Sequence, residues 1–571
     1  MIVPLFVFLD VICELSMPLL MSKIIDVGIA SKDIHYISQI GLYMVLLACA
    51  AICFGILNMR FATLGSMGFG ANLRNALFEK VQSFSFNNID RFSTASLVTR
   101  LTNDANNLQI TFMMALRILL RAPMMLIIAF ILAYQINAEL SVVLAIAIPL
   151  LAISVWAILS TAVKRFTIVQ QKIDAINSAI QENLIGIRVV KSFVRSDFEI
   201  LKFKKANDEF TDSAIRALNV AILNMPVMML VMNGASLAII WLGGQMIFAG
   251  TLGTGELIGF ISYVFQILMS VMMISMVFLM GARAEASAKR VVEVLDTQVD
   301  IADKPELALP AATNIHEPHI RHGKVEFRNV SFKYSLTGSG ENVLSNISFT
   351  AQPGEVVAIV GGTGTGKSTL VSLIPRLYDV MEGEVRIDDV DVRDYKLNTL
   401  RQEIGVVLQK NTLFSGTIRE NLLWGNEDAT QAEIEAACQD AQAHDFIVSF
   451  PKGYDTELGQ GGVNVSGGQK QRLCIARAML KKPQILILDD STSAVDSHTE
   501  AKIRESFYHN LANTTVFIIA QRIISVHDAD KIIVLDDGKV AGIGTHQELI
   551  AHNPIYQEIN SSQQEGVLAN G

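Results

Sequence analysis

Six long apolar segments fill the first half of the chain and restrict its fold more than any other feature. Each runs for about 20 mainly apolar residues, the length that an α-helix needs to cross the hydrocarbon of a bilayer. They cover about 1–22, 40–62, 112–135, 139–161, 218–241 and 258–281. Because a main chain inside a bilayer must satisfy its own hydrogen bonds, these segments predict six membrane-spanning helices.

The first span is expected to be retained, not cleaved as a signal peptide. It has no basic region before the apolar run and no small-residue cleavage site, and Asp10 and Glu14 lie within the run. Lys and Arg cluster in the connections after the second, fourth and sixth spans, whereas the connections at 135–139 and 243–256 contain neither. Basic connections stay in the cytoplasm, so the C-terminal half is expected there too.

The two long cytoplasmic connections, of about 50 residues each, keep a helical pattern of apolar residues. The spanning helices are therefore expected to continue well beyond the bilayer. Short turn-like pieces interrupt them at about 87–93 and 183–188, and such pieces are suited to contacting a soluble domain. A disordered loop is the alternative, which the amphipathic periodicity disfavours.

Composition changes after about residue 300. At 571 residues the chain is too long for one core. We expect a transmembrane domain over 1–300, a linker over 301–322, a mixed α/β domain over 323–560 and a tail over 561–571. The net charge of -9 offers no basic face to nucleic acid. The five cysteines lack the CxxC spacing of metal or redox pairs, and are expected to be buried as small apolar residues.

A glycine-rich loop follows a buried strand at 354–360 and opens a helical run that ends at Tyr378. It has the spacing of a P-loop and consists of Gly361, Gly362, Thr363, Gly364, Thr365, Gly366, Lys367, Ser368 and Thr369. Its glycines let backbone N–H groups converge on phosphate oxygens, Lys367 reaches the β and γ phosphates, and Ser368 ligates Mg²⁺. A second strand, 485–489, ends in Asp489, a carboxylate suited to the same cation. ATP and Mg²⁺ are the expected ligands.

Between these two elements lies a third motif, followed by a helix at 472–480. It consists of Ser466, Gly467, Gly468 and Gln469. The order of P-loop, Gln409, this motif, Asp489 and Ser493-Ala-Val-Asp496 resembles the ATP-binding cassette (ABC) family. With six spans ahead of the cassette, essentially the whole chain resembles the multidrug-type ABC exporters.

The resemblance implies roles for individual positions. Tyr334 would stack on adenine, although a core tyrosine is the alternative. Gln409 would sense the γ-phosphate and share in holding Mg²⁺, and Asp496 matches the D-loop. The motif at 466–469 would cap the γ-phosphate of ATP bound to an opposite cassette, so the working unit is a dimer in a bacterial plasma membrane. The pieces at 87–93 and 183–188 match the coupling helices.

The chain departs from the family at the catalytic positions. Asp490 stands where the general base is usually Glu, Gln521 where the switch is usually His, and Gln460 where a Glu is common. Similar departures occur in the subunit of heterodimeric bacterial exporters that holds a degenerate ATP site, while neutral drift in a homodimer is the alternative. The chain also begins directly in the first span, where the family usually has a short basic amphipathic helix.

Several polar residues in the spans are candidates for contact with a substrate. Asp10 and Glu14 lie one turn apart on one face of the first span and would attract a cation, pair with another helix or line an outer gate. Asn224, Asn233 and Gln266 would face a central cavity or bond neighbouring helices. All methionines except Met381 and Met479 precede residue 300, which suits either an adaptable binding surface or ordinary packing.

The most probable function from sequence is therefore export of lipophilic or cationic drugs, with lipid, peptide or haem as alternative cargoes. From a different class, a subunit that binds ATP as a signal without moving a solute remains an alternative.

Overall fold

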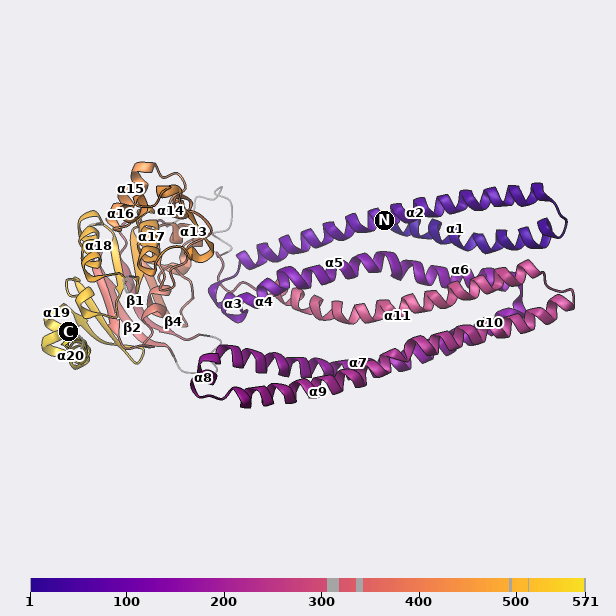
Figure 1. Ribbon diagram of the computed structural model, residues 1–571. Helices are drawn as coiled ribbons and strands as arrows, with labels where there is room; N and C mark the ends of the chain where they lie inside the picture. Colours follow the sequence, from indigo (N-terminus) through magenta and orange to yellow (C-terminus); the bar gives the residue numbers. More distant parts are fainter. Residues whose placement is uncertain (1, 305–317, 335–341, 492–494, 512, 569–571) are drawn as a thin grey trace. The chain divides into compact units, whose positions relative to one another are not determined.

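The computed structural model describes residues 2–304, 318–334, 342–491, 495–511 and 513–568, and the chain divides into two compact units (Figure 1). One consists of Met1–Lys80 and Ala95–Asp296 and is called here the membrane unit. The other consists of Val81–Thr94 and Thr297–Gly571 and is called the cassette unit. A short stretch of the first cytoplasmic connection thus belongs with the C-terminal unit.

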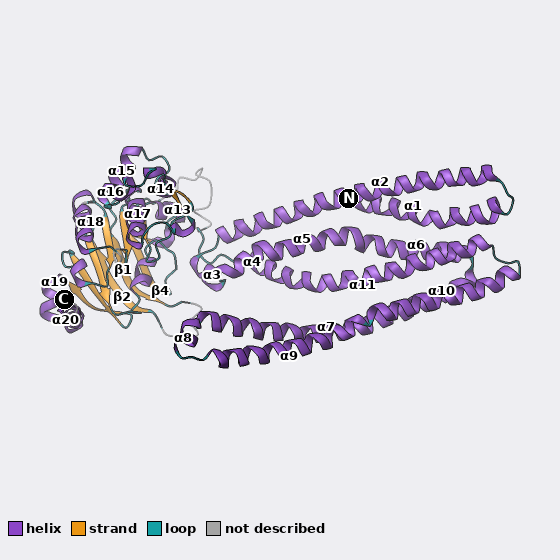
Figure 2. Cartoon of the chain, viewed as in Figure 1, coloured by secondary structure: helices purple, strands orange, loops and turns teal. Residues whose placement is uncertain are grey.

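The membrane unit is helical throughout its described elements (Figure 2). In chain order these are α1 (Val3–Lys23), η1 (Ile24–Ile29), α2 (Ile34–Gln82), α4 (Thr94–Thr99), η2 (Arg100–Asp104), α5 (Ala105–Met114), η3 (Ala115–Leu119), α6 (Leu120–Ile136), α7 (Ala138–Ile185), α8 (Ile187–Ser192), α9 (Ser196–Ile222), α10 (Asn224–Phe248) and α11 (Thr254–Asp296). Six stretches of the described chain are long and apolar enough to cross a membrane, which confirms the six predicted spans.

The longest helices exceed what a bilayer requires. Helix α2 has 49 residues and α7 has 48, so at ~1.5 Å per residue each is roughly 70 Å long. The hydrocarbon core of a bilayer is only about 30 Å thick. The helices are therefore longer than a crossing of the hydrocarbon requires, as the sequence predicted.

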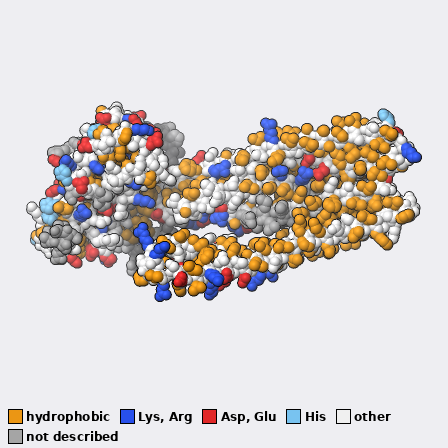
Figure 3. Space-filling view, viewed as in Figure 1, with side chains coloured by type: hydrophobic (Ala, Val, Ile, Leu, Met, Phe, Trp, Pro, Cys, Tyr) orange, Lys and Arg blue, Asp and Glu red, His pale blue; other side chains and the backbone are white. Residues whose placement is uncertain are grey.

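The interior of the membrane unit is apolar and tightly packed. Val7, Val11 and Leu15 of α1 are buried in a cluster that extends through α6, α7, α10 and α11. Tyr263 of α11 is fully buried, and its hydroxyl donates to the carbonyl oxygen of Leu15 at 2.6 Å. Hydrophobic side chains also cover much of the visible outer face of the long helices, as expected of a surface that faces lipid (Figure 3).

Polar contacts fix both ends of α11. At its start, the Asp26 carboxylate accepts hydrogen bonds from the N–H groups of Gly255 and Glu256 at 2.6 and 2.8 Å. A Cβ on Gly255 would lie 2.5 Å from the Ser22 carbonyl oxygen, so the close approach of α1 and α11 at this point requires glycine. Near the other end, Arg290 donates to Asp104 of η2 at 2.7 Å.

The cassette unit contains two main sheets and a short pair (Figure 2). The larger sheet has the order β12-β11-β3-β10-β9-β6, in which β12 (Lys539–Gly544) is antiparallel and the other strands are parallel. The parallel strands are β3 (Val356–Gly361), β6 (Ile404–Val407), β9 (Ile485–Asp489), β10 (Thr515–Ile519) and β11 (Lys531–Asp536). The antiparallel sheet contains β2 (Leu344–Ala351), β1 (Val325–Phe332), β4 (Glu382–Ile387) and β5 (Val390–Asp391), and the pair contains β7 (Gly416–Thr417) and β8 (Glu457–Leu458).

Besides the sheets, the cassette unit contains a series of helices. They are α12 (Lys367–Ser372), α13 (Leu397–Gln402), α14 (Ile418–Leu423), α15 (Gln431–Asp440), α16 (His444–Val448), α17 (Gly467–Leu480), α18 (Ser497–Asn510), α19 (His546–His552) and α20 (Pro554–Leu568). Of these, α12, α13, α17 and α19 contact strands of the larger sheet. Along β3, Val357 and Ile359 face the antiparallel sheet while Ala358 faces helices, so both faces are buried. The predicted fold class, a helical membrane domain followed by an α/β P-loop domain, is confirmed.

The two turn-like pieces form short helices. The first is α3 (Phe86–Arg91), where the Ser85 hydroxyl accepts from the Asn88 N–H and the Asn88 side chain accepts from the Ser85 N–H. The second, α8, begins at Ile187 after a break at Gly186, so residues 183–185 still belong to α7. Residues 305–317 of the expected linker lie outside the described residues.

Candidate functional site

The predicted P-loop joins β3 to α12 through backbone conformations that favour glycine. Gly361, Gly364 and Gly366 have φ values of 157, 84 and 90°, and the helix begins at the next residue, Lys367. A Cβ on Gly361 would lie 2.2 Å from the Leu535 carbonyl oxygen. Gly361 is therefore required because two segments of the chain lie close together at that point. Gly364 and Gly366 are required because of their positive φ.

A cleft of about 650 Å³ opens beside this loop and brings together most of the predicted nucleotide residues. Those that line it are Tyr334, Gly361, Gly362, Thr363, Gly364, Gly366, Lys367, Ser368, Thr369, Gln409, Asp489, Asp490 and Gln521. Thr365 does not line the cleft, and its hydroxyl donates to the Gly362 carbonyl oxygen at 3.0 Å. Parallel strands end at the same edge of the sheet, which is why the ends of β3 and β9 meet here.

Oxygen atoms and one ammonium group converge on the floor of the cleft. The Ser368 hydroxyl donates to the Asp489 carboxylate at 2.9 Å, and Lys367 Nζ donates to the Gly361 carbonyl oxygen at 3.0 Å. Burial raises the pKa of Asp489, with the Ser368 hydrogen bond opposing it, and burial lowers the pKa of Lys367. A phosphate would replace the carbonyl contacts of Lys367 with a stronger anionic partner.

Two of the three departures from the family at the catalytic positions, Asp490 and Gln521, lie in direct contact. Gln521 Nε2 donates to Asp490 Oδ2 at 2.8 Å, and the Asp490 carboxylate is also hydrogen-bonded to Gln409. Burial raises the pKa of Asp490. Its backbone has a φ of 48°, a left-handed conformation that Asp adopts more readily than most residues other than Gly and Asn. The local backbone thus favours the shorter side chain.

The signature motif forms a helix start outside this cleft. Ser466 is the N-cap of α17, where its hydroxyl accepts from the Gln469 N–H and the Gln469 side chain accepts from the Ser466 N–H. No signature residue is among the described residues that line the cleft. Asp496 caps α18 by accepting from the Thr499 N–H at 3.0 Å, and Ser493 of the same motif lies outside the described residues.

Tyr334 belongs to an aromatic cluster that sequence reasoning did not anticipate. Its ring meets that of Tyr378 edge-on, with centroids 5.2 Å apart and planes at 89°, and its hydroxyl lies 2.9 Å from Thr369 Oγ1. The Tyr378 hydroxyl donates to the Asp90 carboxylate of α3 at 2.7 Å. Burial and this hydrogen bond both raise the pKa of Tyr378. Tyr334, which is expected to stack on adenine, therefore contacts Tyr378, and Tyr378 is hydrogen-bonded to Asp90 of the first cytoplasmic connection.

The two carboxylates of the first span are paired with an arginine. Arg121 Nη1 lies 2.9 Å from Asp10 Oδ2, and the same guanidinium is bonded to Glu14. The π-helical segment η3 precedes Arg121 and Pro123 follows it, so the helix is irregular where the charge is placed. Arg121 was missed in the sequence, although a charge inside the third apolar segment was the signal for it.

The remaining candidates in the spans differ in their exposure. Asn233 is exposed, whereas Asn224 and Gln266 are partly buried. The side-chain oxygen atoms of Asn224 and Gln266 accept no hydrogen bond within the described part of the chain. Buried oxygen atoms of this kind are suited to receive a donor from a ligand or from water.

Comparison with known proteins agrees with the sequence motifs. Residues 1–271 match the family model of the ABC transporter transmembrane region, and residues 344–493 match that of the ABC transporter. YfiB of Bacillus subtilis (strain 168), an uncharacterized ABC transporter ATP-binding protein, is 41% identical over 552 residues, covering 96% of this chain and 94% of YfiB. The ATP-dependent lipid A-core flippase of Syntrophus aciditrophicus (strain SB) is 34% identical over 86% of this chain and 80% of its own length.

Similarity in structure is as extensive. A bacterial Atm1-family ABC exporter with ATP bound is 25% identical and superimposes with a TM-score of 0.82, covering 98% of both chains. Six membrane-spanning helices, a P-loop domain and relatives that match nearly end to end all lead to one assignment. This chain belongs to the ABC transporter family, as an exporter half-transporter with one transmembrane domain and one cytoplasmic ATP-binding domain.

Proposed function

We propose that this chain is one of two unlike subunits of an ATP-driven exporter, and that its own cleft binds ATP but hydrolyses it slowly. The hydrogen bond between Gln521 and Asp490, 2.8 Å long, carries the proposal. A general base must lie within about 2.6–3.2 Å of the proton it takes, and Asp has a side chain about 1.5 Å shorter than Glu. One oxygen of Asp490 is already bonded to an amide, and Gln521 cannot carry the charge that His can.

Mg²⁺ fits the donor set of the cleft. The Ser368 hydroxyl and the Asp489 carboxylate lie 2.9 Å apart, and both offer the hard oxygen atoms that this cation prefers. We assign them, with Gln409, to hold it. When bound, Mg²⁺ would neutralise charge on the phosphate oxygen atoms. Lys367 contributes a second positive charge, and Tyr334 provides a flat surface for adenine.

The signature motif is proposed to complete the partner's ATP site. Ser466 is the N-cap of α17, and its hydroxyl is fixed by the hydrogen bond that it accepts from the Gln469 N–H. It lies outside the cleft of its own chain. The positive end of α17 is suited to an anion on another molecule. Two cassettes that meet in this way form one weak and one efficient site when the partner carries Glu and His.

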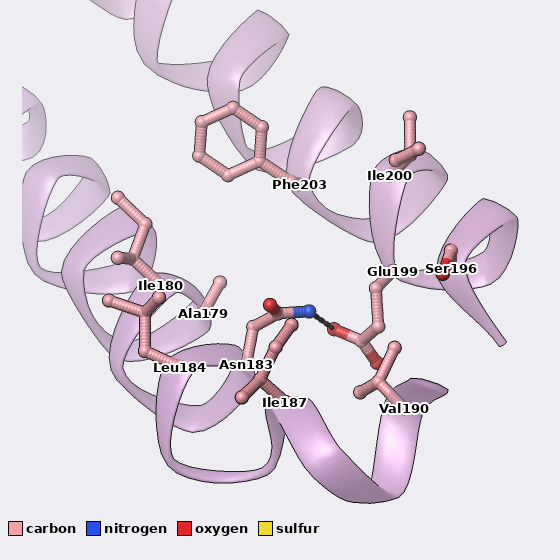
Figure 4. Close-up of a pocket in the computed structure, with 10 residues that line it drawn as sticks. All are labelled: Ala179, Ile180, Asn183, Leu184, Ile187, Val190, Ser196, Glu199, Ile200 and Phe203. Carbon is pink, nitrogen blue, oxygen red and sulfur yellow. Dashed lines mark hydrogen bonds between the residues drawn. The ribbon is translucent and has the colours of Figure 1, made fainter. Parts of the chain in front are cut away.

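The region around α8 also suits contact with the partner's cassette. Phe193 and Val194 are 74% and 86% exposed, and Val194 has a φ of 52°, which is strained for a β-branched residue. Beneath α8 lies an apolar pocket of about 350 Å³, in which Figure 4 shows the Asn183 amide pointing toward Glu199. Exposed apolar side chains at a cytoplasmic turn are most stable when another protein surface covers them.

The transported compound is proposed to be lipophilic or cationic. The group of Asp10, Glu14 and Arg121 keeps one formal negative charge in excess, which favours a cation. YgaD of Bacillus subtilis (strain 168), whose name proposes multidrug export, is 35% identical over 86% of this chain and 83% of its own length. A lipid is the second candidate, because another relative is named as a lipid A-core flippase. ATP-driven uptake of a cationic dye into inverted vesicles would exclude a subunit that only senses ATP.

The slow site should become faster when the usual residues are restored. We expect the purified chain alone to hydrolyse ATP slowly, and the double variant Asp490→Glu with Gln521→His to hydrolyse it at least about tenfold faster. General base catalysis contributes roughly 10²–10⁴-fold, and left-handed backbone at residue 490 is less favourable for Glu, so only part is recovered. Phosphate release measures the rate.

Adding Lys367→Ala to the double variant should remove the gain, which assigns the activity to this cleft. Vigorous hydrolysis by the unmodified chain alone, at the rate of the double variant, would contradict a degenerate site. An export assay with the partner then tests whether two unlike subunits are required.

The contact between Tyr378 and Asp90 is proposed to transmit nucleotide binding to the spans. Tyr378→Phe keeps the ring against Tyr334 but removes a hydrogen bond to a charged group, typically worth about 1.5–3 kcal/mol. We expect dye export per ATP hydrolysed to fall about threefold, with the KM for ATP within a factor of two. Tyr395→Phe is the matched control, because it removes a buried hydroxyl that donates to the Ile387 carbonyl oxygen. Equal losses in both variants would argue against a coupling role.

A further inference from the structure

The C-terminal helix forms part of the wall of the nucleotide cleft. Glu558, Ile559, Ser562 and Gln563 of α20 line it together with Tyr334 and the P-loop. Residues four positions apart share one face of a helix, so a single face of α20 is turned toward the cleft. No sequence motif assigned this helix to the site.

Gln563 connects that helix to the main chain of the switch segment. Its side-chain Nε2 donates to the Gln521 carbonyl oxygen at 2.7 Å, and its Oε1 accepts from the Ile523 N–H at 2.8 Å. One amide thus satisfies a main-chain acceptor and a main-chain donor two residues apart, in the segment that runs from the end of β10 into the turn Ile523–Ser525. Loop backbone without a ladder partner is fixed by such side-chain bonds.

The helix is itself firmly held at its other end. Tyr556 is fully buried, its hydroxyl lies 2.8 Å from His546 Nδ1, and its N–H donates to Asn553 Oδ1 at 2.9 Å. Asn553 in turn donates to the Ala541 carbonyl oxygen of β12. Gln563 therefore extends from a rigid base, so its position is set by the cassette and not by the loop that it contacts.

We infer that Gln563 is a positioning residue of the ATP site, which holds the main chain of Gln521 so that the Gln521 side chain stays against Asp490. Loss of Gln563 should affect only the end of the cleft that contains Asp490 and Gln521. Asp490 lies near Lys367, the residue expected at the β and γ phosphates, and its charge interacts with that of Lys367. Loss of Gln563 should therefore weaken the binding of a triphosphate more than that of a diphosphate. This inference rests on the proposed assignment of the cleft residues, and not on the proposal of two unlike subunits.

The test compares nucleotide affinities of the purified full-length chain. Gln563→Ala is expected to weaken binding of a non-hydrolysable ATP analogue about three- to tenfold while ADP binding changes less than about twofold. Gln563→Glu keeps the acceptor for the Ile523 N–H but turns a carboxylate oxygen toward the Gln521 carbonyl oxygen and adds a negative charge to the cleft, so its loss of triphosphate binding should be at least as large. Ser561→Ala is the matched control, since the Ser561 hydroxyl bonds only the Glu558 carbonyl oxygen within α20.

Two results would overturn the inference. One is an equal loss of both nucleotides in Gln563→Ala, because that indicates a merely structural role. The other is unchanged affinity for both. An unmodified chain that binds neither nucleotide would overturn the ATP site itself and this inference with it, and that result is distinguishable because the controls would fail as well.

Discussion

Replacing Ser466 by aspartate is expected to reduce ATP turnover by the assembled transporter roughly 10²–10³-fold, the effect of losing one donor to a developing anion. The fold should survive, because aspartate caps a helix as well as serine does, and Ser466 is the N-cap of α17. The cause would be electrostatic. A carboxylate would stand where the proposed role requires a hydroxyl facing the γ-phosphate of ATP on the partner.

The control is Thr430→Asp, which also replaces the N-cap hydroxyl of a helix, here α15, by a carboxylate, and does so beside Glu433 where α17 has Gln469. It is expected to leave turnover within a factor of two. The measurement is phosphate release by the purified complex of both subunits, with circular dichroism to compare folding.

The difference in rate between the two ATP sites is tested by a variant in this chain's own P-loop. Lys367→Ala in this chain removes the P-loop cation of the slow site, so we expect turnover by the complex to fall less than about tenfold. An equally large loss in Ser466→Asp and Lys367→Ala would mean that both sites hydrolyse ATP alike, and the degenerate-site proposal would be wrong.

Removing Arg121 is expected to be the most damaging single change in the membrane unit. Arg121→Ala leaves the buried Asp10 carboxylate and the partly exposed Glu14 carboxylate without their cation. Breaking a fully buried ion pair costs about 3–5 kcal/mol, and the loss here should be smaller because only Asp10 is buried. Asp10 is 5% exposed, so water cannot replace the lost partner there. The amount of chain extracted in folded form from membranes, and its melting temperature in detergent, should both fall.

A triple variant distinguishes the loss of the ion pairs of Arg121 from the loss of packing by its side chain. Asp10→Asn and Glu14→Gln combined with Arg121→Ala should restore most of the folded protein, because replacing a whole ion cluster by neutral groups is often close to neutral. The double neutralisation alone also tests the substrate role. Unchanged export of cationic dyes at normal expression would remove Asp10 and Glu14 from substrate recognition.

Features that depend on local sequence were predictable. Six spans follow from length and hydropathy, since lipid leaves few alternatives to a helix. The P-loop follows from glycine spacing, because Gly364 and Gly366 adopt positive φ values that other residues avoid. The strand that ends at Asp489 was recognisable for a similar reason, as a short buried apolar run bounded by polar residues.

Features that depend on contacts between distant residues were not predictable. The sequence shows that Arg121 needs a partner, but not that the partner lies 107 residues earlier on α1. Gln563 carries no motif, and its role arises only because α20 folds back over the cleft. The turn-like piece predicted at about 183–188 spans the end of α7, the break at Gly186 and the start of α8. Its exact bounds could not be predicted, because Gly186 has an ordinary negative φ of -87°.

The interruptions in the third span have a mechanical consequence. Helix α2 runs for 49 residues without an internal proline, whereas α7, of 48 residues, carries Pro149 in its interior, so α2 is expected to be the stiffer of the two. The helical run from Thr94 to Ile136 instead contains two π-helical joints, η2 and η3. Because bending concentrates where the regular hydrogen-bond ladder is broken, bending of this helical run should collect at these joints, one of which ends two residues before Arg121. The ion pairs of Arg121 with Asp10 and Glu14 would then hold α1 and α6 together at the point where the third span bends.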